Sequence, residues 1–214
     1  MITVLVADDH AMVRAGIVRM LDDADGISVI AQAASGEEVI SSCRVLRPHI
    51  VLMDVRMPGI GGLEATRKLK LIAPDTRVIA LSAYDQEPMP SLLLKAGAAA
   101  YVTKGASEQE MILAVRLVAK GQRYLSPGVA QKMALKQLNG NDNSPFESLS
   151  EREMQISLMI ANCHKVQEIS DNLHISAKTV NSYRYRVFEK LDISGDVELT
   201  LLAMRHGLID VPET

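Results

Sequence analysis

The sequence predicts two folded domains: an α/β domain with a doubly wound parallel sheet, (βα)5, and an all-α domain of four helices. Three observations support this. Short apolar runs alternate with helix-forming stretches over residues 1–120, residues 149–214 show no strand pattern, and the polar stretch NGNDNSPFES lies between them. Alternating strands and helices form parallel sheets with right-handed crossovers.

Five apolar runs, rich in Val and Ile, predict the strands of the first domain. Several are apolar throughout, as expected for strands buried on both faces of a sheet. The runs are ITVLVA (2–7), ISVIAQA (27–33), HIVLMD (49–54), RVIALS (77–82) and AAAYVT (98–103). Helices are expected at 11–21, 36–46, 62–72, 90–95 and 108–119. We expect the flavodoxin-like strand order 2-1-3-4-5.

Residues 121–148 are expected to form a linker, with a helix starting near Pro127. In the second domain, 149–214, Ser150 and Glu153 have the spacing of a capping box at the start of its first helix. The short amphipathic segment VQEISDNL and the longer segment AKTVNSYRYRVFEKL, preceded by Ser176, follow. A short helix, a tight connection and a longer basic helix predict a helix-turn-helix.

The net charge, the cysteines and the lengths of the apolar runs are those of an intracellular globular protein without a membrane-spanning segment. It has 214 residues and a net charge of −3, so it is not basic overall. Its two cysteines, Cys43 and Cys163, lie far apart and are expected to be reduced thiols. No apolar run is long enough to span a bilayer, so we expect no membrane insertion and a cytoplasmic location.

Polar side chains gather where the predicted strands end. Asp8 and Asp9 follow the first strand, Asp54 ends the third, Ser82 ends the fourth and Lys104 follows the fifth. The carboxyl ends of parallel strands share one edge of the sheet, so these groups are expected to converge there.

The expected cluster has the chemistry of a phosphoryl-transfer site. Three carboxylates suit a hard cation such as Mg²⁺, which would offset the repulsion between Asp8 and Asp9. Asp54 can attack a phosphoryl group to form an acyl phosphate, with Lys104 and Mg²⁺ stabilising the transferred oxygens and Ser82 donating a hydrogen bond to one of them. No strong base is evident near the acyl phosphate, so it is expected to persist and to be lost slowly. This suits a switch better than an enzyme.

Asp8-Asp9, LMDVRMPG, ALSAY and AYVTK together resemble the receiver domain of two-component response regulators, over about residues 1–120. The resemblance implies that Asp54 is the phosphoacceptor and that Mg²⁺ is bound by Asp8 or Asp9, by Asp54 and by the backbone carbonyl of Arg56. It further implies that Ser82 and Tyr101 are switch residues and that Lys104 binds the phosphoryl group. Gly105 stands where many receivers have proline.

The longer helix of the second domain has one apolar stripe and one polar side. The stripe is expected at Val180, Tyr183, Val187 and Leu191. The polar side and its flanks, with Lys165 before the short helix, are candidates to contact phosphates or base edges of DNA. These candidates are Lys165, Lys178, Thr179, Asn181, Ser182, Arg184, Tyr185 and Arg186. A solvated helix face with no DNA contact is the alternative.

LSEREMQISLMIA, EIS, ISAKTVNSYRYRVFEKLDI and ELTLLAMRHGLI resemble the LuxR-type DNA-binding domain of the NarL/FixJ family, over about 149–209. The resemblance implies that the third helix enters the major groove and that the last mediates a homodimer. Val197, Leu201 and Met204 would form that dimer face, although packing within the domain could explain some of them. Where the family commonly has glycine near Cys163, Asn162 is expected to take the left-handed conformation.

KTVNSYRYR followed by DVELT resembles most closely the GacA/UvrY branch of this family. This implies a membrane-bound hybrid sensor histidine kinase as phosphodonor, promoter DNA as ligand and small regulatory RNA genes as targets.

Two other functions are open. DNA binding independent of phosphorylation is the first. An aspartate-nucleophile phosphatase is the second, but such enzymes usually need a second Asp two positions after the nucleophile as acid and base, where this chain has Arg56.

Overall fold

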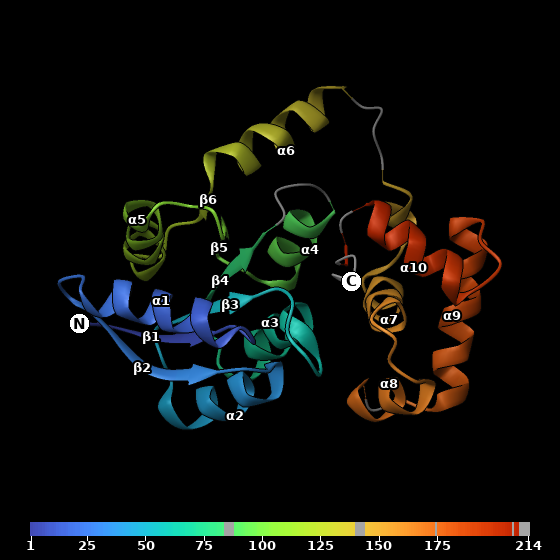
Figure 1. Cartoon of the computed structure of the whole chain (residues 1–214), viewed down its shortest axis with the longest axis horizontal. Coiled ribbons are helices and arrows are strands. Elements are labelled where there is room, and N and C mark those ends of the chain that lie inside the picture. The colour runs from blue at the N-terminus through green and yellow to red at the C-terminus, as the bar shows by residue number, and fades with distance from the viewer. Residues whose placement is uncertain (84–87, 140–143, 174, 207, 210–214) are drawn as a thin grey trace. The chain divides into compact units, whose positions relative to one another are not determined.

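The computed structural model describes residues 1–83, 88–139, 144–173, 175–206 and 208–209 (Figure 1). The expected linker residues 140–143 and the chain end at 210–214 lie outside the described residues. The chain divides into two compact units, one formed by Met1–Asp85 with Pro90–Ala134, the other mainly by Leu135–Thr214.

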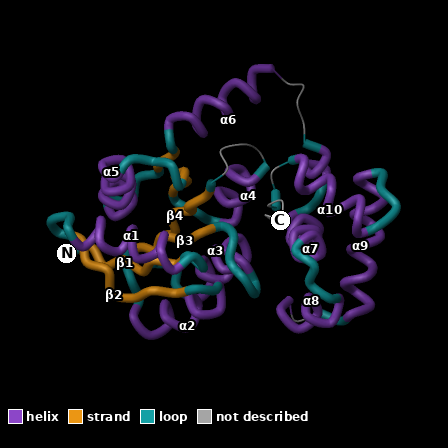
Figure 2. Tube along the Cα trace, viewed as in Figure 1, coloured by secondary structure: helices purple, strands orange, loops and turns teal. Residues whose placement is uncertain are grey.

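The first unit is a parallel sheet with helices on both faces (Figure 2). Its strands are β1 (Ile2–Ala7), β2 (Ile27–Ala33), β3 (Ile50–Asp54), β4 (Arg77–Ser82), β5 (Ala100–Thr103) and β6 (Tyr124–Leu125). Its helices are α1 (Ala11–Asp22), α2 (Gly36–Leu46), α3 (Gly61–Ile72), α4 (Met89–Ala96) and α5 (Glu108–Ala119). The strand order β2-β1-β3-β4-β5-β6 confirms the predicted order of the first five strands.

Alternation along the strands divides the core between the two faces of the sheet. Val4 and Val6 pack in one cluster with residues of α1 and α5, whereas Leu5 and Ala7 pack in the other with residues of α2 and α3. All four are completely buried, because each face is covered by helices. The apolar runs in the sequence therefore reflect burial on both sides.

Strand β6 was not predicted. It has only two residues, too few for a recognisable pattern, and it pairs in parallel with β5. Ser126 follows it and is buried: its backbone N–H donates to the Tyr101 carbonyl at 2.9 Å, and its hydroxyl accepts from the Thr103 N–H at 3.3 Å. Helix α6 (Pro127–Asn139) starts at the next residue, where the sequence predicted a helix.

The second unit consists of helices. They are the 3-10 turn η1 (Pro145–Ser148) and the helices α7 (Glu151–Ala161), α8 (Val166–Leu173), α9 (Ala177–Leu191) and α10 (Asp196–Arg205). Both hydrogen bonds of the predicted capping box between Ser150 and Glu153 are present at the start of α7. Met154 and Ile156 of α7, Ile169 of α8, and Val180 of α9 are completely buried and form part of its core.

The turn between α7 and α8 corrects one expectation. Cys163, not Asn162, takes the left-handed conformation, with φ 62°. Asn162 stays near the helical region because its side-chain amide donates to the Leu158 carbonyl, 2.8 Å away and one turn earlier. The left-handed residue therefore falls one position later.

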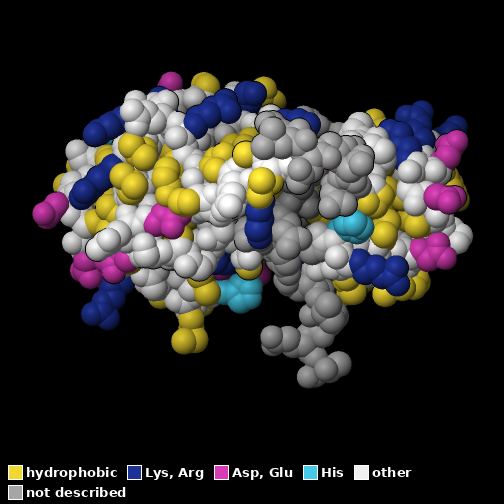
Figure 3. Space-filling model, turned by 90° about the horizontal axis from the view of Figure 1, so that it is seen from above, with side chains coloured by type: hydrophobic (Ala, Val, Ile, Leu, Met, Phe, Trp, Pro, Cys, Tyr) yellow, Lys and Arg dark blue, Asp and Glu magenta, His cyan; other side chains and the backbone are white. Residues whose placement is uncertain are grey.

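Among the described residues, no helix is both long and apolar enough to cross a membrane. On the face seen in Figure 3, charged side chains lie among the hydrophobic ones.

Candidate functional site

The polar groups predicted at the strand ends lie at one edge of the sheet. β1, β3, β4 and β5 are consecutive neighbours, with Asp54 paired to Leu81 and Ser82 paired to Thr103. The Lys104 N–H donates to the Ser82 carbonyl at 2.7 Å, which extends this pairing by one residue.

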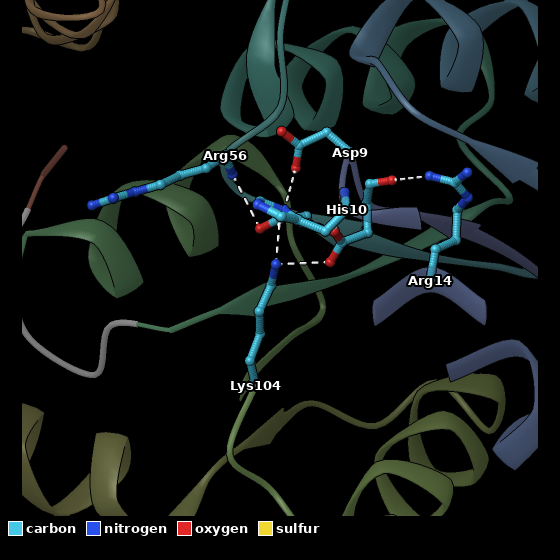
Figure 4. A network of polar contacts seen from close by, with 7 residues as sticks. Asp9, His10, Arg14, Arg56 and Lys104 are labelled. Carbon is cyan, nitrogen blue, oxygen red and sulfur yellow. Dashed lines mark hydrogen bonds and ion pairs between the residues drawn. The ribbon is translucent and has the colours of Figure 1, made fainter. Parts of the chain in front are cut away.

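Lys104 joins two of the carboxylates directly. Its Nζ donates to Asp8 Oδ2 at 2.7 Å and to Asp54 Oδ2 at 2.8 Å (Figure 4). Asp8 is completely buried and Asp54 is 2% exposed, so both charges lie largely out of water. Buried carboxylates are costly without a partner, and the ammonium supplies that partner.

Glycine at position 62 lets helix α3 approach the end of β3. A Cβ there would lie 2.2 Å from the Asp54 carbonyl oxygen, and the Gly62 N–H donates to the Val55 carbonyl at 3.1 Å. The close approach places the start of α3 beside the loop that follows Asp54.

The environment perturbs the charges of this pair. Burial raises the pKa of Asp54 above its ordinary value, and the hydrogen bond and charge of Lys104 offset only part of that effect. Burial alone would lower the pKa of Lys104, but the hydrogen bonds to Asp54 and Asp8 and the negative charges of these carboxylates together outweigh burial and raise it. Lys104 therefore remains a cation at neutral pH.

Four side chains at this edge have the donor set of a metal site. Asp8, Asp9, His10 and Asp54 each offer one ligand atom, and these atoms all lie within 4.8 Å of one another. The carboxylate oxygens fit the preference of Mg²⁺ for oxygen ligands.

His10 is the residue that sequence reasoning missed. Its Nδ1 lies 2.9 Å from Asp9 Oδ1 and 3.4 Å from Asp8 Oδ1, so an imidazole stands beside the carboxylates of the cluster. The available signal was its position immediately after Asp9, at the start of the first helix.

The remaining predicted residues of this unit are Arg56, Ser82 and Tyr101. The Arg56 N–H donates to Asp54 Oδ1 at 3.2 Å, which fixes the backbone that follows the strand. Ser82 is 3% exposed and Tyr101 is completely buried, so both side chains are directed into the structure.

Helix α9 begins at the predicted cap: Ser176 accepts a hydrogen bond from the Thr179 N–H. Val180, Val187 and Leu191 are buried as predicted, but Tyr183 is only half-buried and Phe188 is buried in addition. The Arg186 guanidinium lies over the Tyr183 ring, 5.8 Å from its centre.

The candidate DNA-contacting side chains differ in their exposure to solvent and in their contacts within the unit. Lys165, Lys178, Ser182, Tyr185 and Arg186 are exposed, and Thr179 and Asn181 are half-buried. Arg184 is held within its own unit: its guanidinium binds both carboxylate oxygens of Asp196 and lies 5.5 Å from the centre of the Phe188 ring.

Helix α10 presents apolar side chains to solvent. Val197 is 74% exposed and Leu201 49% exposed, while Met204 is half-buried. Packing within the unit therefore does not account for Val197 and Leu201.

Comparisons with known proteins agree with both units. Residues 4–116 match the response regulator receiver domain model, and residues 147–203 match that of the bacterial regulatory proteins of the luxR family. The chain is 60% identical over 210 residues to the response regulator GacA of Pseudomonas protegens, covering 98% of this chain and 99% of that one. It is 54% identical over 209 residues to the response regulator UvrY of Escherichia coli K12, covering 97% and 96%.

Two solved structures of the RcsB response regulator from Salmonella share the fold. One covers 98% of each chain with a TM-score of 0.76 and 22% identity. The other, bound to a promoter with the phosphomimetic BeF3⁻, covers 94% of this chain and 97% of that one with a TM-score of 0.73 and 23% identity.

Proposed function

The chain belongs to the two-component response regulators with a LuxR-type DNA-binding domain, and from this we propose the residues and partners by which it works. It is a phosphorylation-dependent, DNA-binding regulator of transcription. The proposed division is a receiver at 1–120, a linker at 121–148 and a DNA-binding domain at 149–214. The single observation that carries the proposal is the buried Asp54 carboxylate held by Lys104 at the edge of a parallel sheet.

Asp54 is the proposed phosphoacceptor. One of its carboxylate oxygens attacks the phosphorus of a phosphohistidine on a membrane-bound hybrid sensor kinase. A P–O bond forms as the P–N bond of the donor breaks, which leaves the donor histidine unphosphorylated. Lys104 pairs with the transferred oxygens, and the Ser82 hydroxyl donates a hydrogen bond to one of them.

A Mg²⁺ ion would be held by Asp8 or Asp9, by Asp54 and by the Arg56 carbonyl. When bound, it neutralises charge on the transferred phosphoryl oxygens. The acyl phosphate is then lost slowly. We propose slow loss because the imidazole near the site is paired with carboxylates, with His10 Nδ1 2.9 Å from Asp9 Oδ1 and 3.4 Å from Asp8 Oδ1, and is not placed to activate water.

Phosphorylation would shift a population between two states through Ser82 and Tyr101. The active state would bind promoter DNA as a homodimer, including promoters of small regulatory RNA genes. Exposed residues of α9, with Lys165 beside α8, would contact the DNA, and Val197, Leu201 and Met204 would form the dimer face.

The test combines phosphorylation with DNA capture. Full-length protein is incubated with Mg²⁺ and a small acyl phosphate, its phosphorylation is followed by mass spectrometry, and the genomic fragments that it binds are sequenced. We expect phosphorylation and enrichment of a few promoters with symmetric half-sites. Asp54→Asn should lose both, whereas Asp75→Asn, an exposed aspartate outside the cluster, should lose neither.

Other outcomes would replace the proposal. Equal DNA enrichment by the wild type and by Asp54→Asn would indicate DNA binding independent of phosphorylation. Steady-state hydrolysis of phosphate esters would indicate a phosphatase. The sequence argues against this activity, because Arg56 occupies the position two residues after Asp54 where such enzymes usually have a second aspartate.

A further inference from the structure

His10 has no packing or capping role that explains its place in the cluster. Its side chain is 69% exposed, and it makes no side-chain hydrogen bond to cap helix α1. Its backbone N–H, in contrast, donates to Asp8 Oδ1 at 2.8 Å. The backbone bond fixes the start of the helix and turns the imidazole toward the carboxylates (Figure 4).

The position of the imidazole is compatible with a shared metal ion. Its Nδ1 lies 2.9 Å from Asp9 Oδ1, and the ligand atoms of the four residues lie within 4.8 Å of one another. An octahedral ion with bonds of about 2.1 Å separates opposite ligands by about 4.2 Å and adjacent ligands by about 3.0 Å. One ion can therefore be reached by the nitrogen and by carboxylate oxygens with small side-chain adjustments.

We propose that Nδ1 of His10 is a metal ligand and that it widens the metal selectivity of this site. Imidazole nitrogen binds divalent transition ions well, whereas Mg²⁺ prefers oxygen. Adding one nitrogen ligand to several carboxylate oxygens therefore increases the affinity for Mn²⁺ more than the affinity for Mg²⁺. The inference rests on the proposed function, because it places His10 at the same site.

The competing explanation is that His10 only orients Asp9 through a hydrogen bond. Two variants separate the roles. His10→Gln keeps an amide that can donate to Asp9 but provides no imidazole nitrogen, and His10→Ala removes both functions. A positioning role would be largely restored by glutamine, whereas metal ligation by nitrogen would not.

The experiment uses full-length protein loaded with Mn²⁺. Pulsed electron paramagnetic resonance detects a ¹⁴N nucleus bound to the ion, and calorimetry measures affinity for Mn²⁺ and for Mg²⁺ in parallel. We expect a ¹⁴N coupling in the wild type and in His164→Gln, a control histidine in the other unit, but none in His10→Gln. The loss of one imidazole ligand should weaken Mn²⁺ binding about tenfold and Mg²⁺ binding less than about twofold.

Two results would overturn the inference. A wild-type protein that binds Mn²⁺ without ¹⁴N coupling has no imidazole ligand. Equal weakening of Mn²⁺ and Mg²⁺ binding by His10→Ala, with both affinities restored in His10→Gln, would assign His10 a positioning role only. In either case, retained Mg²⁺ binding and Asp54 phosphorylation would leave the proposed function standing, whereas loss of both in the wild type would overturn the proposed function as well.

Discussion

At the scale of single residues, the buried charge of Asp54 makes the fold less stable at neutral pH. A carboxyl whose pKa is higher in the folded than in the unfolded state favours folding below its unfolded pKa, and this contribution is lost as the pH rises through the folded pKa. Because burial raises the pKa of Asp54, Asp54→Asn should raise the midpoint of thermal unfolding at pH 7. The gain should vanish as the pH falls below about 4, near the ordinary carboxyl pKa.

Thermal unfolding followed by circular dichroism from about pH 3 to pH 8, a range that includes the ordinary carboxyl pKa, checks this prediction, with Asp75→Asn as the exposed control. An Asp54→Asn protein that is less stable than the wild type at pH 7 would contradict the prediction. It would show that the Lys104–Asp54 ion pair stabilises the fold by more than burial of the Asp54 charge destabilises it.

Gly62 is predicted to be intolerant of any side chain. Its Cβ would overlap the Asp54 carbonyl oxygen, at 2.2 Å, and the Val55 Cα, at 2.9 Å, and both contacts are to backbone. Gly62→Ala should therefore cost about 1–3 kcal/mol of unfolding free energy, as overpacking does, measured by urea denaturation. Gly105→Ala is the matched control, because no atom lies within 4 Å of its Cβ position. Similar losses in both variants would contradict the steric explanation.

The sequence predicted those members of the cluster that lie at the end of a strand or directly after it. Asp8, Asp54 and Lys104 follow from the rule that parallel strands place their carboxyl ends at one edge. His10 does not end a strand, and its contact with Asp9 depends on the backbone hydrogen bond to Asp8 at the start of α1. That local geometry leaves no periodic signal in the sequence.

At the scale of elements, helix α9 shows what periodicity can and cannot predict. The apolar spacing correctly predicted burial of Val180, Val187 and Leu191. The pairing of Arg184 with Asp196 joins two helices across 12 residues, so no pattern within α9 could indicate it. The short β6 was missed for a similar reason, because its only support is pairing with β5.

Lys178 and Arg184 are expected to respond differently to substitution, although both are cations of α9. Lys178 is exposed and forms no ion pair within the described residues, so Lys178→Ala should weaken binding to all DNA sequences and lower the salt slope of log K by about 1. Arg184 is bound to Asp196, so Arg184→Ala should chiefly destabilise the domain, by roughly 0.5–1 kcal/mol for a partly exposed pair.

Fluorescence anisotropy on DNA at several salt concentrations, with urea unfolding in parallel, measures both effects. The prediction would be wrong if Arg184→Ala left the stability unchanged and lowered the salt slope as much as Lys178→Ala does. Arg184 would then be a DNA-contacting residue.

At the scale of the whole molecule, the two units have separate cores built on different periodicities. Continuous apolar strand runs predicted the first, and helical spacing with a capping box predicted the second. Residues 1–120 therefore carry the proposed phosphorylation site and α9 the proposed DNA contact. Because the two proposed sites lie in different units, we expect phosphorylation to act on DNA binding through the assembly or the accessibility of the second unit.

Assembly through α10 is the form of coupling that the exposed side chains favour. Val197 and Leu201 lie one turn apart and are 74% and 49% exposed, which leaves an apolar strip without cover within its own unit. Burying two such side chains contributes about 1.5–3 kcal/mol each. Replacing both with glutamate should therefore weaken the proposed dimer of the phosphorylated protein by at least about 100-fold.

Sedimentation equilibrium with the phosphodonor measures this loss, and binding to paired and single half-sites shows its consequence. Dimers hold two half-sites about one DNA turn apart, so the double variant Val197→Glu, Leu201→Glu should lose affinity for paired sites and keep that for a single site. The double variant Val45→Glu, Leu46→Glu replaces two exposed apolar residues of α2 and is the control matched for added charge; it should remain dimeric. A double variant that still dimerises would place the dimer face elsewhere on the chain and leave the strip on α10 without this function.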